Sequence, residues 1–189
     1  MNNYFFKKNY VSITAGQFKG KKIFFSNTSN VRPTMSRIRE TLFNWLSKNI
    51  KNAHCLDCFA GSGVLGIESI SHYAKSVTSL EIEKKTVLTL LKNIQKLKIN
   101  NINIIHTNSI YWLKKNGTPY DIIFIDPPYK MNLLNKTIIL LNKNNWIKKN
   151  SIIYIEKDKK TPLVIPKNWI LHKQKKTSKI EFFLYIFNV

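Results

Sequence analysis

The stretch D-I-I-F-I-D-P-P-Y-K at residues 121–130 ends an apolar run with an acid, two prolines and a tyrosine. Asp126 stands where a buried strand would end, so we expect its carboxylate at the carboxyl edge of a sheet. Consecutive prolines fix the backbone and remove two amide donors, which leaves nearby carbonyls free to accept hydrogen bonds. A carboxylate beside such a carbonyl suits an exocyclic amino group, and Tyr129 offers a flat face for stacking a base. The alternative is a rigid turn with a buried aromatic.

A second stretch, D-C-F-A-G-S-G-V-L-G at residues 57–66, places glycines where another strand would turn into a helix. Glycines let the backbone approach a ligand closely, and Asp57 would reach into the same crevice. Glu81 would end the next strand, where a carboxylate can accept hydrogen bonds from ribose hydroxyls. These residues predict a nucleotide-type site, although the spacing also fits dinucleotide binding or an ordinary tight turn.

Apolar runs alternate with helical ones between residues 53 and 160. The pattern predicts strands at 54–59, 76–81, 102–106, 120–126 and 151–156, and helices at 63–73, 83–97, 109–115 and 133–141. Strands that alternate with helices pair in parallel through right-handed crossovers, which predicts a three-layer α/β sheet. The runs at 169–175 and 179–187 indicate an antiparallel hairpin at one edge.

The first 35 residues differ from the rest. Short strand-like runs at 11–15 and 21–26 predict a small hairpin, Pro33 marks a turn, and Ser36 is expected to cap a helix. We therefore divide the chain into an N-terminal β-hairpin extension, residues 1–35, and an α/β domain, residues 36–189.

Basic residues outnumber acidic ones by 31 to 10, which gives a net charge of +21. A field that strong favours a polyanionic partner such as nucleic acid. Lysine supplies 28 of these charges in a chain also rich in Asn and Ile, so AT-rich codons could account for part of the excess. The only three arginines, Arg32, Arg37 and Arg39, fall within eight residues. Because arginine offers a planar fork for carboxylate or phosphate, we interpret this cluster as part of a site.

Other patterns limit the function. Cys55 and Cys58 lie in an apolar segment without a second pair at metal-ligand spacing, so we expect two buried strand residues and no metal. No run of 18 apolar residues occurs, and the first residues lack a signal peptide pattern. We expect a cytoplasmic protein without a membrane segment. Nothing in the sequence indicates an obligate dimer, so we expect a monomer.

The order of these segments resembles one family. D-P-P-Y after an apolar strand, with D-x-F-A-G-S-G upstream, is similar to the amino-methyltransferases that use S-adenosylmethionine to methylate exocyclic base nitrogens. V-R-P-T-M-S-R-I-R-E, L-E-I-E and P-K-N-W-I-L-H-K extend the resemblance to the bacterial 16S rRNA (guanine-N2) methyltransferases, the RsmD family. The resemblance covers the chain from about Ile13 to Phe187.

This resemblance implies a class I (Rossmann-like) methyltransferase domain over residues 36–189. The expected fold is a three-layer sandwich with a mostly parallel seven-stranded sheet, a C-terminal antiparallel hairpin, and a small N-terminal β-hairpin plus helix. The implied activity is S-adenosylmethionine-dependent methylation of the N2 amino group of a guanine in 16S rRNA, in an assembling or assembled small ribosomal subunit. An amino-methyltransferase acting on DNA or tRNA, and a non-catalytic basic assembly factor, remain alternatives.

Residue roles follow from the same resemblance. The target guanine would be held by Asp126, Pro127, Pro128 and Tyr129. The cofactor would be bound by Thr34, Arg37, Asp57, Phe59, Ala60, Gly61, Gly63, Glu81, Ile82, Asn108, Ser109 and Asp126, with Glu81 at its ribose and Asn108 and Ser109 at its adenine. The basic residues themselves, rather than the resemblance, predict RNA contacts at Arg32, Arg39, Lys19, Lys21, Lys22 and Lys130. A solvated lysine-rich face is the alternative for the lysines.

Overall fold

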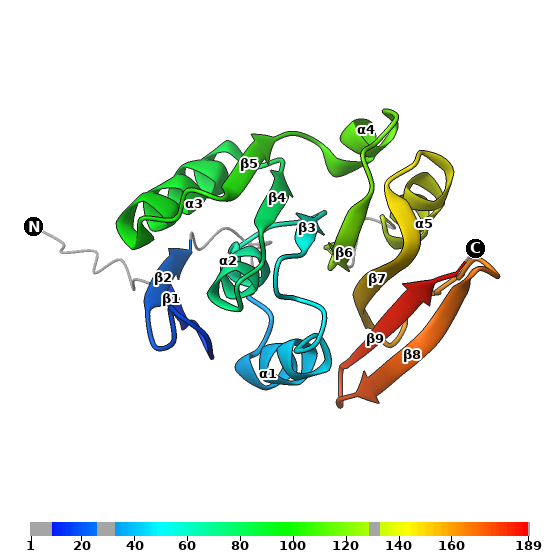
Figure 1. The fold of residues 1–189 in the computed structure, drawn as a ribbon, viewed down its shortest axis with the longest axis horizontal. Helices are drawn as coiled ribbons and strands as arrows, with labels where there is room; N and C mark the ends of the chain where they lie inside the picture. Colours follow the sequence, from blue (N-terminus) through cyan, green and yellow to red (C-terminus); the bar gives the residue numbers. More distant parts are fainter. Residues whose placement is uncertain (1–8, 26–32, 129–132, 189) are drawn as a thin grey trace, which may run out of the picture.

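A seven-stranded sheet crosses the molecule in the order β5-β4-β3-β6-β7-β9-β8 (Figure 1). The computed structural model describes residues 9–25, 33–128 and 133–188. The strands of this sheet are β3 (His54–Asp57), β4 (Ser76–Glu81), β5 (Ile102–His106), β6 (Tyr120–Ile125), β7 (Ile147–Asp158), β8 (Trp169–Lys176) and β9 (Ile180–Phe187). The first five are parallel, whereas β9 runs antiparallel to both β7 and β8. The predicted mostly parallel sheet with a C-terminal antiparallel hairpin is therefore confirmed.

Helices cover both faces of the sheet. They are α1 (Ser36–Trp45), α2 (Val64–Ser71), α3 (Lys84–Leu97), α4 (Ser109–Leu113) and α5 (Leu134–Lys143). In Figure 1, α1 and α2 lie on one side of the sheet, and α4 and α5 lie on the other. Successive residues of β6 point to opposite faces: Ile122 and Phe124 join the core with α1 and α2, while Ile123 and Ile125 join the core with α4 and α5. Burial on both faces explains why the last four residues of this strand, 122–125, are all apolar.

Several element ends lie a few residues from the predicted ones, such as the end of β3 at Asp57 instead of residue 59, and two of the differences have a clear physical cause. Strand β7 begins before residue 151 because Ile147 already pairs with Tyr120, across an irregularity where Asn150 has a φ of 67°. Helix α1 begins at Ser36, and its first turn closes on the carbonyl of Met35, which accepts hydrogen bonds from Ile38 and Arg39. The prediction that Ser36 caps this helix is therefore wrong, since Met35 holds that position without a side-chain bond.

The N-terminal hairpin, formed by β1 (Asn9–Ser12) and β2 (Lys22–Phe25), packs against the large domain. Ile13 and Ile23 are buried in the same core as α1 and α2. The Asn93 side chain on α3 donates to the Phe24 carbonyl at 2.6 Å and accepts from the Phe24 amide at 3.0 Å. These bonds fix the hairpin to α3 as a further strand would. The boundary after residue 35 remains a prediction.

Both cysteines are buried, as predicted. Within the described ranges, no helix is long and apolar enough to cross a membrane. The same residues contain no cluster of three or more His, Cys, Asp or Glu side chains that could hold a metal ion.

Candidate active site

Four acidic residues gather at the carboxyl edge of the parallel strands. Asp57 ends β3, Glu81 ends β4, and Asp126 directly follows β6. Glu156 lies in β7, one residue beyond the pairing of Ile125 with Ile155, and its charge acts on Asp126. Parallel strands present their carboxyl ends at one edge of a sheet, and ligands of open α/β sheets bind there. The structure therefore brings the predicted Asp57, Glu81 and Asp126 together and adds Glu156.

Asp57 is the most deeply buried of these acids, at 1% exposure. Its Oδ1 accepts a hydrogen bond from the Phe59 amide at 3.3 Å, whereas its Oδ2 has no hydrogen-bond partner among the described residues. Burial, with the nearby charge of Glu81, raises the pKa of Asp57 to about 7, and the Phe59 amide opposes this shift. A buried carboxylate with an unpaired oxygen is costly unless a ligand supplies a partner.

The glycine loop lies beside Glu81. Gly61 donates its amide hydrogen to Glu81 Oε2 at 2.9 Å, and Glu81 Oε1 accepts from the Glu83 amide at 2.8 Å. Each carboxylate oxygen can accept a second bond, so Glu81 keeps acceptor capacity for a diol. Burial raises the pKa of Glu81, and these backbone amides oppose the shift.

Position 63 in this loop requires glycine. Its φ is +73°, and a Cβ there would lie 2.3 Å from Leu90 Cδ2. Its amide donates to the carbonyl of Ala60 at 2.7 Å, and the amide of Ala60 donates to the Leu80 carbonyl. The loop is thereby tied to the end of β4.

The predicted adenine contacts lie at the next strand end. Ile82 is 61% exposed although it follows the buried Glu81, and the His106 ring is hydrogen-bonded to its carbonyl at 3.0 Å. Asn108 is exposed and accepts from the Tyr111 amide, so it caps α4. Ser109 is buried, and its hydroxyl donates to the carbonyl of Cys58. An exposed apolar side chain beside an exposed amide suits a heteroaromatic ring.

Asp126 lies between Asp57 and Glu156 in the row of acids, because β6 stands between β3 and β7. It is partly exposed and is followed by the buried Pro127. The Thr34 hydroxyl donates to its Oδ2 at 3.3 Å. Burial of the carboxyl, together with the charges of Glu156 and Asp57, raises the pKa of Asp126 well above its usual range, while the Thr34 hydroxyl lowers it. A cationic or hydrogen-bond-donating ligand would favour the ionised form.

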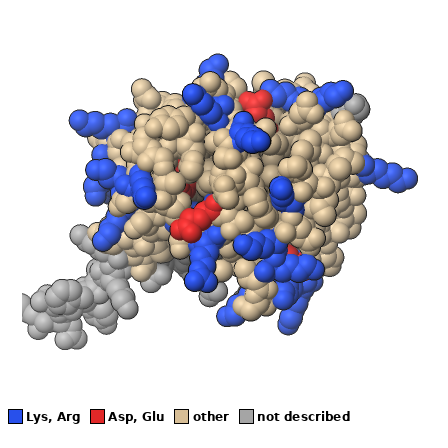
Figure 2. Space-filling view, turned by 60° about the horizontal axis from the view of Figure 1, so that its bottom comes forward, with Lys and Arg blue, Asp and Glu red and all other residues tan. Residues whose placement is uncertain are grey.

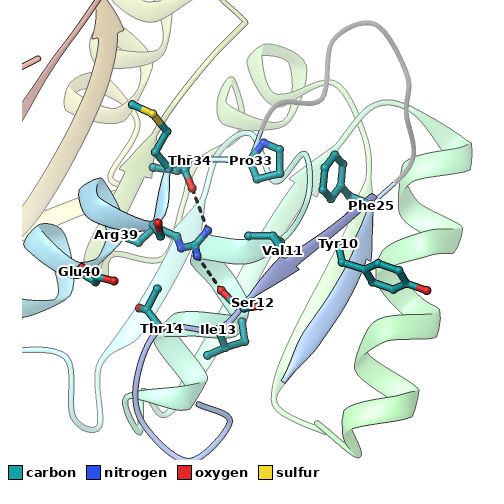
Figure 3. A pocket seen from close by; sticks show the side chains of 12 residues that line it. Tyr10, Val11, Ser12, Ile13, Thr14, Phe25, Pro33, Thr34, Arg39 and Glu40 are labelled. Atoms are coloured by element: carbon teal, nitrogen blue, oxygen red, sulfur yellow. Dashed lines mark hydrogen bonds between the residues drawn. The ribbon is translucent and has the colours of Figure 1, made fainter. Parts of the chain in front are cut away.

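A groove of about 510 Å³ opens between the hairpin and the start of α1 (Figure 3). Tyr10, Ser12 and Thr14 line it from the hairpin, and Thr34 and Glu40 line it from the other side. Because Thr34 also reaches Asp126, the groove adjoins the row of acids.

Arg39 corrects one prediction. It was expected to contact RNA, but its side chain is 1% exposed and forms an ion pair with the equally buried Glu68, with 3.3 Å between Nε and Oε1. Its two terminal nitrogens donate to the carbonyls of Thr34 and Ser12 (Figure 3). Because its fork is buried against these carbonyls and Glu68, Arg39 is a structural residue in this fold and cannot reach a phosphate.

The other predicted basic contacts differ in position. Arg37 is exposed on α1, and Lys19, Lys21 and Lys22 are exposed on the hairpin. Figure 2 shows Lys and Arg side chains in several groups across one face, with few acids among them. Three predicted site residues, Arg32, Tyr129 and Lys130, lie outside the described residues.

Two site residues were missed by the sequence reasoning. Glu156 near the end of β7 repeats the pattern of an apolar strand followed by an acid, the same signal that identified Asp126. Glu68 is the one charged residue of α2, in the segment G-V-L-G-I-E-S-I, and all residues of this helix are buried. A charge within such a segment indicates a buried partner, which here is Arg39.

Known proteins are similar to this chain over nearly its full length. The family model described as conserved hypothetical protein 95 matches residues 11–186. A ribosomal RNA small subunit methyltransferase D from Buchnera aphidicola subsp. Acyrthosiphon pisum is 62% identical over 188 residues, covering 98% of each chain. Its counterpart of the same name from Escherichia coli strain K12 is 41% identical over 176 residues, covering 93% of this chain and 89% of that protein.

A solved structure has the same fold. A putative methyltransferase from Escherichia coli matches with a TM-score of 0.88 at 39% identity, covering 96% of this chain and 99% of that one. The fold is therefore the class I, Rossmann-like methyltransferase fold that the sequence resemblance predicted.

Proposed function

The chain belongs to the family described as conserved hypothetical protein 95, alongside relatives named ribosomal RNA small subunit methyltransferase D, and we propose that it methylates small-subunit rRNA. The observation that carries this proposal is the position of Asp126. It joins a nucleotide-type half site, formed around Asp57 and Glu81, to a partly open edge where a second ligand can enter. A basic surface around an acidic centre suits a polyanion whose reacting part is a hydrogen-bond donor.

S-adenosylmethionine is the cofactor that this site suits. It would supply a methyl group on a sulfonium, and it carries an ammonium, a ribose diol and an adenine. The unpaired Oδ2 of Asp57 and the raised pKa values along the row of acids fit a cationic ligand. Glu81 would accept from the diol, and the exposed Ile82 would cover one face of the adenine beside Asn108. The remaining proposed cofactor residues are Thr34, Arg37, Phe59, Ala60, Gly61, Gly63 and Ser109.

The target we propose is the N2 amino group of a guanine. Its two protons match two acceptors, the Asp126 carboxylate and the carbonyl of Pro127, whose direction the proline ring restricts. The amino lone pair is delocalised into the ring, so holding it in line can lower the barrier by about 7–11 kcal/mol. As positive charge develops on this nitrogen, the Asp126 carboxylate stabilises it. Pro128 and Tyr129 would complete the base site.

An enzyme with this substrate works where small ribosomal subunits are found, so we place it in the cytoplasm, acting as a monomer on the subunit or its rRNA. Extruding a base costs a few kcal/mol, and less where the base is unpaired. We therefore expect the target guanine in an exposed loop.

A transfer assay tests this function. Labelled S-adenosylmethionine is incubated with the protein and four substrates: small ribosomal subunits lacking base methylation, their naked rRNA, tRNA, and DNA. We expect label only in the small-subunit samples, and the first two substrates show whether assembly is needed. Label in tRNA or DNA alone would replace the proposed substrate. Cofactor binding without transfer to any of them would favour a non-catalytic assembly factor.

A further inference from the structure

The buried guanidinium of Arg39 joins three separate parts of the chain. Its Nη1 donates to the Thr34 carbonyl at 2.9 Å, and its Nη2 donates to the Ser12 carbonyl at 2.7 Å. Its Nε lies 3.3 Å from Oε1 of Glu68 on α2. The same Oε1 accepts from the amide and hydroxyl of Thr14, at 2.8 and 2.9 Å. The guanidinium of Arg39 therefore contacts three segments: the hairpin, the residues before α1, and helix α2, which follows the glycine loop.

A lysine could not form this junction. An ammonium is a point charge on a flexible stem, whereas the planar fork directs several donors at fixed angles. Burying such a charge is costly even with a carboxylate partner, because both ions lose their hydration. In a chain where 28 of the 31 basic residues are lysine, one of only three arginines occupies this buried place. The geometry of the fork, and not the charge alone, is what the position requires.

Thr34 links this junction to the row of acids. Its backbone carbonyl is held by Arg39, and its hydroxyl donates to Asp126 Oδ2 at 3.3 Å. Thr34 is 5% exposed and precedes α1, so the helix does not hold its backbone. Without Arg39, this carbonyl would lose its charged donor and the hydroxyl would be free to turn away from Asp126.

Holding the hairpin in place is not enough to explain why Arg39 is buried at this junction. The hairpin is also fixed by Asn93 on α3 and by Ser71 on α2, whose carbonyl accepts from the Gln17 amide at 2.9 Å. Within the described part of the chain, neither Asn93 nor Ser71 is hydrogen-bonded to Thr34, whereas Arg39 bonds to it directly.

We propose that Arg39, paired with Glu68, is a positioning residue for the methyl transfer, acting through Thr34 to orient the Asp126 carboxylate toward the target amino group. This inference rests on the proposed function for its catalytic consequence. The geometric part, that Arg39 controls Thr34 and Thr34 controls Asp126, stands independently of any substrate.

The ionisation of Asp126 reports this coupling. The charged groups that act on it are Glu156 from β7 and Asp57 from β3, which both raise its pKa, while the Thr34 hydroxyl from the residues before α1 lowers it. Losing the hydroxyl contact should therefore raise the pKa of Asp126 further. In a plot of methyl-transfer rate against pH, the rate falls on the acid side as Asp126 becomes protonated, and we call this fall the acid limb. The acid limb should then move to higher pH.

The experiment compares Arg39→Lys, Thr34→Val and the double variant with the wild type. We expect each single change to move the acid limb upward and to lower kcat roughly ten- to a hundredfold, with a smaller effect on KM for RNA. Because both act through one hydroxyl, the double variant should resemble Thr34→Val alone. Thr34→Ser keeps the hydroxyl and should return the acid limb to its wild-type pH.

Asn93→Ala is the matched control for stability, since it loosens the hairpin from α3 without touching Thr34. It should lower the melting temperature and leave the acid limb in place. An unmoved limb in Arg39→Lys, or effects of Arg39→Lys and Thr34→Val that add in full, would overturn the proposal.

The pKa of Asp126 can be measured without substrate by NMR titration of its carboxyl carbon. This measurement separates the positioning role of Arg39 from the proposed methyltransferase function. A wild-type protein that transfers no methyl group would overturn the proposed function. An Asp126 titration that is the same in Arg39→Lys, Thr34→Val and the wild type would overturn the positioning role. If Arg39→Lys does not fold, the Thr34→Val and Thr34→Ser pair still decides whether this hydroxyl controls Asp126, and no difference between them would contradict the proposal.

Discussion

Asp126 and Asp121 are the same residue type near opposite ends of one strand, and their surroundings give them different properties. Asp121 is paired with Lys148 at 2.6 Å and accepts from the His54 amide, and these contacts outweigh its burial and lower its pKa. Asp126 has acidic neighbours instead, which raise its pKa. The first arrangement stabilises a charge within the protein, while the second leaves a carboxylate whose best partner is a ligand.

Replacing Asp126 with Asn should lower kcat for methyl transfer by about 10²–10³-fold, because the amide presents one acceptor fewer to the amino group and carries no charge. Affinity for S-adenosylmethionine, measured by calorimetry, should change little. Asp121→Asn serves as the control on the same strand and should retain activity. Retention of most activity by Asp126→Asn would remove Asp126 from the mechanism.

The stability of the free protein should fall as the pH rises from about 4 to about 7. Asp57 has a pKa of about 7 in the fold and 3.8 as its ordinary value, so in this range the unfolded chain has lost a proton that the folded protein keeps. Unfolding then releases a proton, and raising the pH favours it. The contribution of Asp57 is at most roughly 4 kcal/mol, since one pKa unit corresponds to about 1.4 kcal/mol.

Melting temperatures measured between pH 4 and pH 8 test this predicted loss of stability. The melting temperature of Asp57→Asn should depend less on pH. Affinity for the cationic cofactor should rise over pH 6 to 8 in the wild type, because binding favours the ionised carboxylate, and should vary less in Asp57→Asn. An identical pH dependence in both proteins would show that Asp57 does not titrate in this range.

At the residue scale, the acids at strand ends could be predicted because a strand that stops at Asp or Glu places it at the ligand edge. The role of Arg39 could not be predicted, since a basic residue near two other arginines gives no sign of whether it faces solvent. Its partners lie 5, 27 and 29 residues away, at Thr34, Ser12 and Glu68, and only the fold brings them together.

Among the elements, the turn from β3 into α2 is the most constrained, and Gly63 tests it. Gly63→Ala would strain a φ of +73° and place a Cβ 2.3 Å from the buried Leu90 side chain. We expect a loss of more than about 2 kcal/mol in unfolding free energy, measured in urea, and weaker cofactor binding.

Gly20→Ala is the matched control, because its φ is +77° and no described atom lies within 4 Å of the added Cβ. It should cost only the backbone strain, about 1–2 kcal/mol. Equal losses in the two variants would mean that the contact with Leu90 is relieved without cost.

The element order could be predicted because strands and helices alternate from residue 54 to residue 158, and parallel pairing follows from that alternation. The full length of β7 could not, since its first residues are held by a long-range pairing of Ile147 with Tyr120 across a kink at Asn150. Local sequence there, I-K-K-N-S, reads as a turn. The docking of the hairpin through Asn93 was likewise not visible, because one buried Asn in an amphipathic helix resembles a surface residue.

At the scale of the whole molecule, the charge is distributed by sign. The ten acids are few, yet Asp57, Glu68, Glu81 and Glu156 are buried, while Lys and Arg side chains stand out in several groups on the face in Figure 2. A surface of this kind attracts a polyanion from a distance, and the acidic centre then selects a donor or a cation.

The hairpin lysines should contribute to RNA affinity. Replacing Lys19, Lys21 and Lys22 by Gln should weaken binding to small-subunit rRNA and reduce the slope of log affinity against log salt by about 2, if each lysine neutralises one phosphate. The control removes the same charge from exposed lysines near the far edge of the sheet, Lys173, Lys175 and Lys179. Equal slopes in the two triple variants would assign the effect to net charge alone.

The central claim is that Asp126 and the Pro127 carbonyl orient a guanine N2 amino group for methylation, and the most direct test identifies the modified nucleoside. Small-subunit rRNA methylated by the purified protein is digested to nucleosides and analysed by mass spectrometry beside Asp126→Asn. The account predicts N2-methylguanosine with the wild type and a hundredfold or greater reduction with the variant. A methyl group found on another base, on a ring nitrogen or on a ribose would contradict it.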